Sequence, residues 1–451
     1  MNRKIISKLI ESKQDAAIRL SEQIWELAET KYEEYQTSQL FTEALKAEGF
    51  EVTTSLGDIP TAFKGSYGSG KPIIAILGEF DALPNLSQVH GVTEKCPLKE
   101  GGNGHGCGHN LLGAGSFAAA VAIKDYLKDH KIPGTIEFFG CPAEETGAGK
   151  AFMVREHCFD QVDICLSWHP ESHNRLFTNS LANVRVSYDF HGVSSHAAAA
   201  PEMGRSALDA CELMSVGVNY LREHIIPEAR VHYAVTNTGG NAPNVVQAES
   251  SVLYAIRAPK TSQVKHILER VNKVAKGAAL MTETTVDINI VTAYSSILRN
   301  RTLEKVLDEN MQAVFPFTFT DEELHQALEF QKTYTTTPEE PSLSGTYKGD
   351  GDLPFSASTD VGDVSWVVPT SQITSVCLAA GTPMHTWQTV AQVQTSYAKK
   401  GMINAAKVLA MSAVQLFEDP QLVDAAKKDK EMEAGRENYE TLIPPNSKPF
   451  I

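Results

Sequence analysis

The pattern of hydrophobic and polar positions divides the chain into segments of two kinds. From residue 2 to about residue 29, apolar side chains recur at three- and four-residue steps, which predicts an amphipathic helix. Further along, four apolar runs each end in polar or acidic residues: KPIIAILGEFDAL, GTIEFFGCPAEE, VDICLSWHPE and ITSVCLAAGTPMHT. Strands of a parallel sheet are buried on both faces, so these runs predict an α/β fold with a mostly parallel sheet.

The middle of the chain has a different pattern. It begins with the alternating strand LANVRVSYDFHG and continues as helix, strand, strand, helix, strand. This βαββαβ order predicts a ferredoxin-like α+β unit over residues 182–294. Because the parallel-sheet pattern resumes afterwards, we expect this unit to be inserted into a discontinuous catalytic domain made of residues 1–181 and 295–451.

Two further local features can be predicted. The Ala- and Gly-rich stretch NLLGAGSFAAAVAIKDYLKDH reads as a helix that packs closely on the sheet, with Asn110 as its N-cap. The segment from Thr333 to Ser358 is rich in turn-forming residues and predicts a long surface loop.

Composition narrows the class of protein. A length of 451 residues suits two or three domains, and the net charge of −15 disfavours nucleic acid and anionic membranes as partners. The N-terminus lacks the apolar stretch of a signal peptide or membrane anchor, so we expect a cytoplasmic location. Seven cysteines, an odd number without paired spacing, fit a compartment in which thiols stay reduced.

Titratable residues collect where the predicted strands end. Ligands of open α/β sheets bind beyond the carboxyl ends of the strands. The residues expected there are Glu79 and Asp81, Glu144 and Glu145, His169 and His385, together with His105, Cys107 and His109 from the glycine-rich loop GGNGHGCGHN. Cysteine, histidine and carboxylate ligands suit zinc or a similar divalent metal, although each residue alone could equally be an ordinary core or surface group.

Other catalytic motifs are missing from the sequence. The run GNGHGCG does not match the dinucleotide-binding pattern G-x-G-x-x-G, and the chain has no phosphate-binding G-K-S or G-K-T and no G-x-S-x-G elbow. The paired motifs of the zinc deaminases are absent as well. Nucleotide-dependent and serine-hydrolase functions therefore lose their support.

Several motifs in the same order carry a family resemblance. They are GEFDALP, GHGCGHN, GCPAEETGAGK, SWHP, HGVSSHAAAAPEMGRSALDA, NAPNVVQAE, STDVGDVSW and GTPMHTWQ. They resemble the dinuclear-metal amidohydrolases of the aminoacylase and glutamate-carboxypeptidase superfamily. The resemblance implies a zinc-peptidase-like catalytic domain, an inserted lid or dimerisation domain, and two divalent ions, zinc or manganese, in each chain.

The resemblance also implies roles for individual residues. The metal ligands would be Cys107, His109, Glu145, His169 and His385. Glu144 would be the general base, and Asp81 a carboxylate that supports the ligands. His196 would stabilise the oxyanion in the active site of a partner subunit, while Asn244 and Arg257 would hold the free carboxylate of the substrate.

Two positions depart from the common superfamily pattern. Glu79 stands where many members have histidine, and Cys107 where many have aspartate, as in the auxin-conjugate branch. These differences leave the number and identity of the metal ions open. Asp360 and Asp363 lie near the site in the family pattern, but without an assigned role.

The expected activity is metal-dependent hydrolysis of the amide bond in N-acyl or aminobenzoyl amino acids such as p-aminobenzoyl-glutamate. Two alternatives remain open at this point: a dipeptidase acting on β-alanyl or basic dipeptides, and a non-catalytic partner subunit. The resemblance further implies a homodimer, possibly together with a homologous second subunit.

Overall fold

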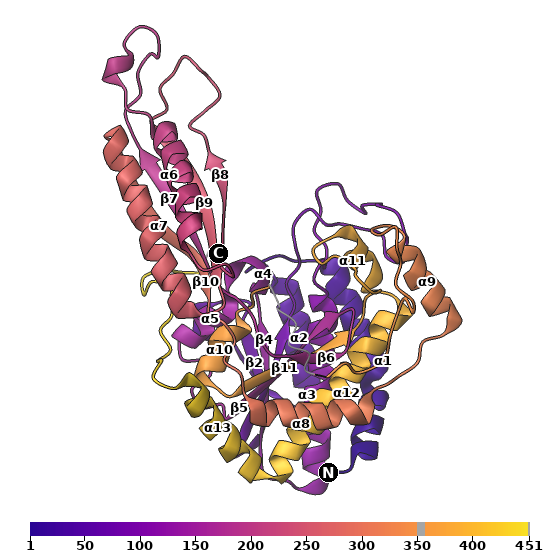
Figure 1. Ribbon diagram of the computed structural model, residues 1–451. Helices are drawn as coiled ribbons and strands as arrows, with labels where there is room; N and C mark the ends of the chain where they lie inside the picture. The colour runs from indigo at the N-terminus through magenta and orange to yellow at the C-terminus, as the bar shows by residue number, and fades with distance from the viewer. Residues whose placement is uncertain (350–356, 450–451) are drawn as a thin grey trace.

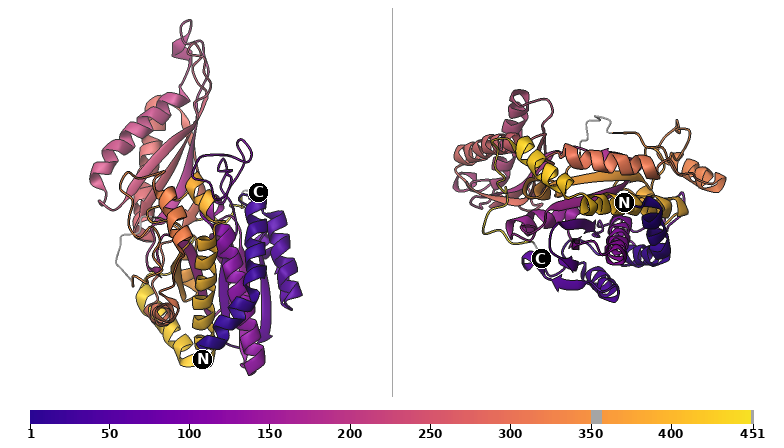
Figure 2. Two further views of the ribbon diagram at one scale, coloured as in Figure 1. Left: turned by 90° about the vertical axis from the view of Figure 1, so that its right-hand side faces the viewer. Right: turned by 90° about the horizontal axis from the view of Figure 1, so that it is seen from below.

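The computed structural model describes residues 1–349 and 357–449, which form two β-sheets flanked by helices (Figure 1). The larger sheet has seven strands in the order β1-β2-β4-β3-β5-β11-β6, and the smaller has four in the order β10-β7-β9-β8. Figure 2 shows from two further directions that the four-stranded sheet and its helices project from one end of the larger part. The predicted fold class is therefore confirmed.

The four apolar runs form the central strands of the larger sheet. They are β3 (Ile73–Glu79), β4 (Gly134–Cys141), β5 (Ile164–Glu171) and β11 (Thr370–Val376), which lie parallel to one another. Every residue of β4 and β11 is buried, as expected for strands covered on both faces.

Antiparallel strands close both edges of this sheet, a feature that the apolar runs do not indicate. At one edge β2 (Phe63–Ser69) pairs with β4, and β1 (Glu51–Thr54) pairs with β2. At the other edge the short strand β6 (Arg175–Phe177) pairs with β11. The edge strand β1 is largely exposed, so it lacks the hydrophobic run that marks the inner strands.

Helices cover the larger sheet. The predicted N-terminal helix is α1 (Arg3–Leu27), which packs with α12 (Ser396–Glu418) against α3 (His109–His130). The remaining helices of this part are α2 (Tyr35–Ala47), α4 (Glu144–Gly147), α5 (Gly149–Arg155), α8 (Arg301–Val314), α9 (Asp321–Gln331), α10 (Val361–Val367), α11 (Trp387–Gln392), α13 (Pro420–Ala434) and the 3₁₀ turn η1 (Leu56–Asp58).

Helix α3 approaches the sheet closely, as its composition predicts. A Cβ atom added at Gly115 would come within 2.9 Å of the Trp168 ring. The predicted cap at Asn110 is wrong, because α3 begins one residue earlier and Gly108, with φ of 78°, is the N-cap. Asn110 instead lies in the first turn, where its Nδ2 donates to the Ser21 carbonyl at 3.4 Å.

The smaller sheet has the predicted strand and helix order. Its elements are β7 (Ala182–His191), η2 (Pro201–Met203), α6 (Ala207–Leu221), η3 (Arg222–His224), β8 (Arg230–Asn237), β9 (Glu249–Ala258), α7 (Thr261–Thr282) and β10 (Thr285–Tyr294). All three strand pairs are antiparallel. We refer to residues 182–294 as the lid, and the division of the chain into domains at these strand ends remains a proposal.

The predicted loop from Thr333 to Ser358 lies partly outside the described residues, since 350–356 are not among them. In its described part, residues 335–349 form no helix or strand, but Ser342 and Leu343 are buried. Among the residues that the structure describes, no helix is both long and apolar enough to cross a membrane.

Candidate metal centre and substrate pocket

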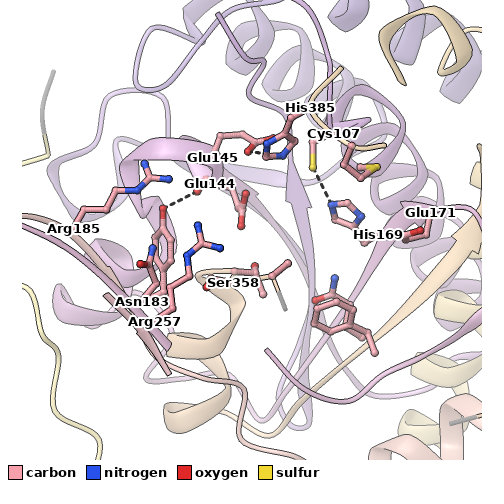
Figure 3. A pocket seen from close by; sticks show the side chains of 16 residues that line it. Cys107, Glu144, Glu145, His169, Glu171, Asn183, Arg185, Arg257, Ser358 and His385 are labelled. Carbon is pink, nitrogen blue, oxygen red and sulfur yellow. Dashed lines mark hydrogen bonds and ion pairs between the residues drawn. The ribbon is translucent and has the colours of Figure 1, made fainter. Parts of the chain in front are cut away.

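The titratable residues singled out in the sequence meet at the carboxyl ends of the parallel strands. Asp81 follows β3, Glu144 and Glu145 follow β4, and His169 lies on β5. His385 follows β11, and the loop before α3 supplies Cys107. Figure 3 shows Cys107, Glu145, His169 and His385 grouped at one end of a pocket. His105, by contrast, is buried with its Nε2 3.0 Å from the Ile24 carbonyl, outside the donor groups described next.

Three overlapping groups of side chains have donor atoms within 4.8 Å of one another. They are Cys107, His109 and His169; Cys107, Glu145 and His385; and Glu79, His109 and Glu144. The Sγ atom of Cys107 lies 3.4 Å from Nε2 of His169, and Nε2 of His385 lies 3.2 Å from Oε2 of Glu145. All five residues predicted as metal ligands therefore lie in one connected cluster.

Asp81 fixes the orientation of two members of this cluster. Its Oδ1 atom lies 2.9 Å from Nδ1 of His109, and its Oδ2 accepts a hydrogen bond of 2.9 Å from the backbone N–H of Glu145. The Nδ1 atom of His169 is held in the same way, 2.8 Å from the carbonyl oxygen of Pro170. Such contacts leave Nε2 of each imidazole directed toward the cluster, the arrangement usual for metal-binding histidines.

The cluster fits a divalent cation. The Nε2 atom of His109 and the Oε1 atom of Glu145 are buried without a hydrogen-bond partner in the described part of the chain. Burial, followed by the charge of Glu145, raises the pKa of the Cys107 thiol well above its usual range. Burial also raises the pKa of Glu145 to about 7. A cation bound between these groups would favour their charged forms and satisfy the unpartnered atoms.

Glu144 stands beside the cluster at the first position of α4. The preceding residue, Ala143, has φ of 59°, a left-handed conformation that turns the chain sharply after β4. Tyr294 donates a hydrogen bond of 3.3 Å to the Glu144 carbonyl. Burial, and then the charges of Glu79 and Asp360, raise the pKa of the Glu144 carboxyl well above its usual range. A carboxyl group with a raised pKa is suited to accept and return a proton.

A buried lysine, which our sequence analysis did not single out, joins two carboxylates at this site. Lys150 is fully buried, with Nζ 2.8 Å from Oε1 of Glu79 and 2.5 Å from Oδ1 of Asp360. Its backbone N–H donates to Oδ2 of Asp360 at 2.8 Å. Asp360 thus anchors Lys150, whereas Asp363 accepts hydrogen bonds from Ser295. The lysine directly after GAG was a sequence signal only in retrospect, since lysine is rarely buried.

The pocket opens next to the cluster and extends to the lid. It encloses about 820 Å³, including its open mouth, which is within the range of small-molecule sites. The residues that line it are Cys107, Glu144, Glu145, His169, Glu171, Phe177, Asn183, Arg185, Arg257, Tyr294, Ala357, Ser358, Thr359, Gln372, Met384 and His385. Arg257 is therefore in the pocket, as predicted, and it is joined there by Asn183 and Arg185, which the sequence analysis missed.

Two predicted residues lie outside this pocket. His196 and Asn244 are exposed on loops of the lid, where the backbone N–H of Ala197 donates to the Asn244 carbonyl at 3.0 Å. Neither residue lines the pocket of its own chain. The structure therefore brings His196 and Asn244 together with each other, but not with the metal ligands.

A cluster of Cys, His and carboxylate donors at the open edge of a parallel sheet, with a buried glutamate beside it, defines a metal-dependent amidohydrolase. The model of peptidase family M20/M25/M40 matches residues 75–441, and the chain belongs to this family. Divalent metal binding follows from this membership together with the donor groups.

Individual proteins agree with this assignment. One of the subunits of the p-aminobenzoyl-glutamate hydrolase of Escherichia coli (strain K12) is 45% identical over 99% of this chain and 98% of its own length. The Xaa-Arg dipeptidase of Mus musculus is 29% identical over 91% of this chain and 88% of its own. A dinuclear metal-binding M20 peptidase from Bacillus subtilis has the same fold, with a TM-score of 0.61, 16% identity and coverage of 90% and 99%.

Proposed function

We propose that this protein hydrolyses the amide bond of N-acyl amino acids of the aminobenzoyl type, such as p-aminobenzoyl-glutamate. The observation that carries the proposal is the position of Glu144, which is buried beside the donor cluster and lines the same pocket as Arg257. The 45% identity to a protein named for this activity supports the choice of substrate.

In this proposal the cluster holds two divalent ions, zinc or manganese. Their ligands are Cys107, His109, Glu145, His169 and His385, with Asp81 orienting His109. When bound, such ions lower the pKa of water and polarise a carbonyl group. A thiolate ligand favours zinc, whereas the surrounding carboxylates would also suit manganese.

The chain's own residues carry the proton and position the substrate. Glu144 takes a proton from the attacking water and delivers it to the amine nitrogen as the amide bond breaks. The guanidinium of Arg257 holds the free α-carboxylate of the amino acid through charge-assisted hydrogen bonds. These two roles place the scissile bond between Glu144 and the lid.

The oxyanion is stabilised by a second copy of the chain in this proposal. His196 and Asn244 are exposed on the lid and absent from the pocket of their own chain, so the partner's His196 and the partner's Asn244 would complete the site. Large apolar side chains are exposed on the lid near these loops, notably Val216 and Tyr220 on α6, at 50% and 76%. Such side chains suit a homodimer interface, and a homologous second subunit could occupy the same face.

The two alternatives are less well supported. A dipeptidase for basic residues would bring a cationic side chain into a pocket that already contains Arg185 and Arg257, and like charges repel strongly where water is excluded. A non-catalytic subunit would have no use for a buried glutamate beside an intact donor cluster.

The proposal is tested by amine release from p-aminobenzoyl-glutamate, N-acyl amino acids and dipeptides, using metal-reconstituted protein and its Glu144→Gln variant. We expect glutamate release by the native protein and a loss of at least ~100-fold in kcat in the variant, which should still bind metal. Near-normal turnover by the variant would contradict the role of Glu144. Activity confined to dipeptides would favour the dipeptidase, and silence across the panel with metal bound would favour the non-catalytic subunit.

A further inference from the structure

The pocket contains more positive charge than one carboxylate requires. Arg185 and Arg257 both line it, and no hydrogen bond or ion pair joins either guanidinium to another group within residues 1–349 and 357–449. Burial lowers the pKa of Arg257, and the proximity of Arg185 lowers it further. Two neighbouring cations without anionic partners are unfavourable in the free protein, unless a ligand supplies the missing charges.

The strand register explains why these side chains lie together. Asn183 of β7 pairs with Arg257 of β9 on one side and with Tyr294 of β10 on the other. Arg185 lies two residues further along β7, so it shares the face of the sheet with Asn183. It is a diagonal neighbour of Arg257, at a typical Cβ separation of about 7–8 Å.

An unpartnered amide lies between the two arginines. Asn183 is fully buried, and neither its Nδ2 nor its Oδ1 atom has a hydrogen-bond partner in the described part of the chain. Leaving both ends of a buried amide unpaired is costly, which indicates that a polar ligand group satisfies them. Figure 3 shows Asn183, Arg185 and Arg257 reaching in from the lid strands, across the pocket from Cys107 and His169.

We infer that Arg185 and Asn183 form a subsite for a second carboxylate of the substrate. This inference rests on the proposed function, in which Arg257 holds the α-carboxylate. The amino acid released from the amide is then dicarboxylic, with its side-chain carboxylate bound to the guanidinium of Arg185 and the Asn183 amide N–H. An acyl conjugate of a monocarboxylic amino acid would leave Arg185 without its counter-charge. Arg185 is thus a specificity-determining residue.

The test compares p-aminobenzoyl-glutamate with p-aminobenzoyl-glutamine, an isostere that lacks the second carboxylate. Arg185→Gln should lower kcat/KM for the glutamate conjugate by about 10- to 100-fold, the ratio expected for a charge-assisted hydrogen bond, and leave the glutamine conjugate almost unchanged. Arg185→Lys should retain part of the preference. Lys273→Gln removes an exposed cation from the lid helix α7 and should change neither substrate. Equal losses on both substrates, or equal rates for both with the native protein, would overturn the inference.

A binding measurement separates this inference from the proposed function. Calorimetric titration with glutarate and with its monoamide reports on the subsite even if neither conjugate is hydrolysed. We expect glutarate to bind the native protein at least ~10-fold more tightly than the monoamide, and Arg185→Gln to abolish the difference. Glutarate preference without hydrolysis would retain the dicarboxylate subsite and reject the reaction. Hydrolysis of both conjugates without any glutarate preference would reject the subsite and retain the reaction.

Discussion

The catalytic part and the lid distribute charge and apolar surface in opposite ways. Below the pocket, Glu79, Asp81 and Lys150 are at most 2% exposed, although charged side chains normally remain in water. On the lid, Tyr220 and Leu280 are 76% and 81% exposed. Buried charges are unfavourable unless they are paired or bind a ligand, and exposed apolar groups are typical of interfaces. Each part thus shows its function where it departs from the usual arrangement.

The difference extends to how each part is stabilised. The catalytic part surrounds its charges with a large core in which the rings of Phe41, Phe63, Phe80 and Phe138 pack together. The lid has two helices that pack against its sheet, and most of strand β8 is exposed. A rigid core can hold charged groups in fixed positions, whereas an edge strand and apolar helix surface are available to a second chain.

The largest stability effect should come from removing the buried cation. Lys150→Met leaves Glu79 and Asp360 without their ion-pair partner, and breaking a buried pair typically destabilises by about 3–5 kcal/mol. Lys265→Met, which removes an exposed pair with Glu440, should leave the free energy of unfolding almost unchanged. Urea unfolding of the two variants measures this contrast. Equal effects would show that Lys150 is not held by its charge.

The next effect concerns substrate binding at the border between the two parts. Arg257→Ala should lower kcat/KM by about 1.5–3 kcal/mol for substrates with a free α-carboxylate, because a charge-assisted hydrogen bond is lost. Steady-state kinetics with carboxyl-amidated substrates provide the control, since these should be affected little. An equal loss on amidated substrates would make Arg257 structural.

Acid should weaken the catalytic part through Asp163, which ties the start of β3 to the C-terminal helix α13. Partial burial alone would raise the pKa of Asp163, but hydrogen bonds from the Ile73 N–H, Lys427 and Lys71 lower it below its usual range. A carboxylate with a lowered pKa stabilises the fold above about pH 4, its unfolded value, and this contribution is lost as pH falls through the folded pKa.

Asp163→Asn should therefore reduce stability at pH 7 by about 1 kcal/mol and flatten the pH dependence below about pH 4. Thermal unfolding between about pH 2 and pH 7 measures both effects. Glu26→Gln, at an exposed position of α1, is the matched control and should follow the native curve. A native-like acid limb in the Asp163 variant would refute the assignment.

The smallest change in folding stability should accompany a change in assembly. The double variant Val216→Ser and Tyr220→Ser alters exposed side chains of α6, so the free energy of unfolding should shift by less than about 0.5 kcal/mol per site. If this face forms a homodimer, light scattering should show a shift toward monomer, and activity should fall as the partner's His196 is lost. An unchanged dimer would place the interface elsewhere, and a fully active monomer would remove His196 from the mechanism.

Much of the architecture could be predicted because burial leaves a direct mark on sequence. The inner strands β3, β4, β5 and β11 are continuous apolar runs, and the lid elements alternate with the expected periods. The antiparallel edge strands β1 and β6 are short or exposed and carry no such mark. The Asn110 cap was mispredicted because the left-handed conformation of Gly108 let α3 start one residue earlier.

The sequence by itself determined the fold class, the order of elements and the meeting of the predicted metal ligands, since parallel strands end at one edge of a sheet. Only the tertiary structure decided what surrounds them. The pairing of Lys150 with Asp360 joins residues 210 positions apart, and the approach of Arg185 to Arg257 depends on the register of β7 and β9. Contacts of this kind depend on packing between distant segments, which local periodicity does not record.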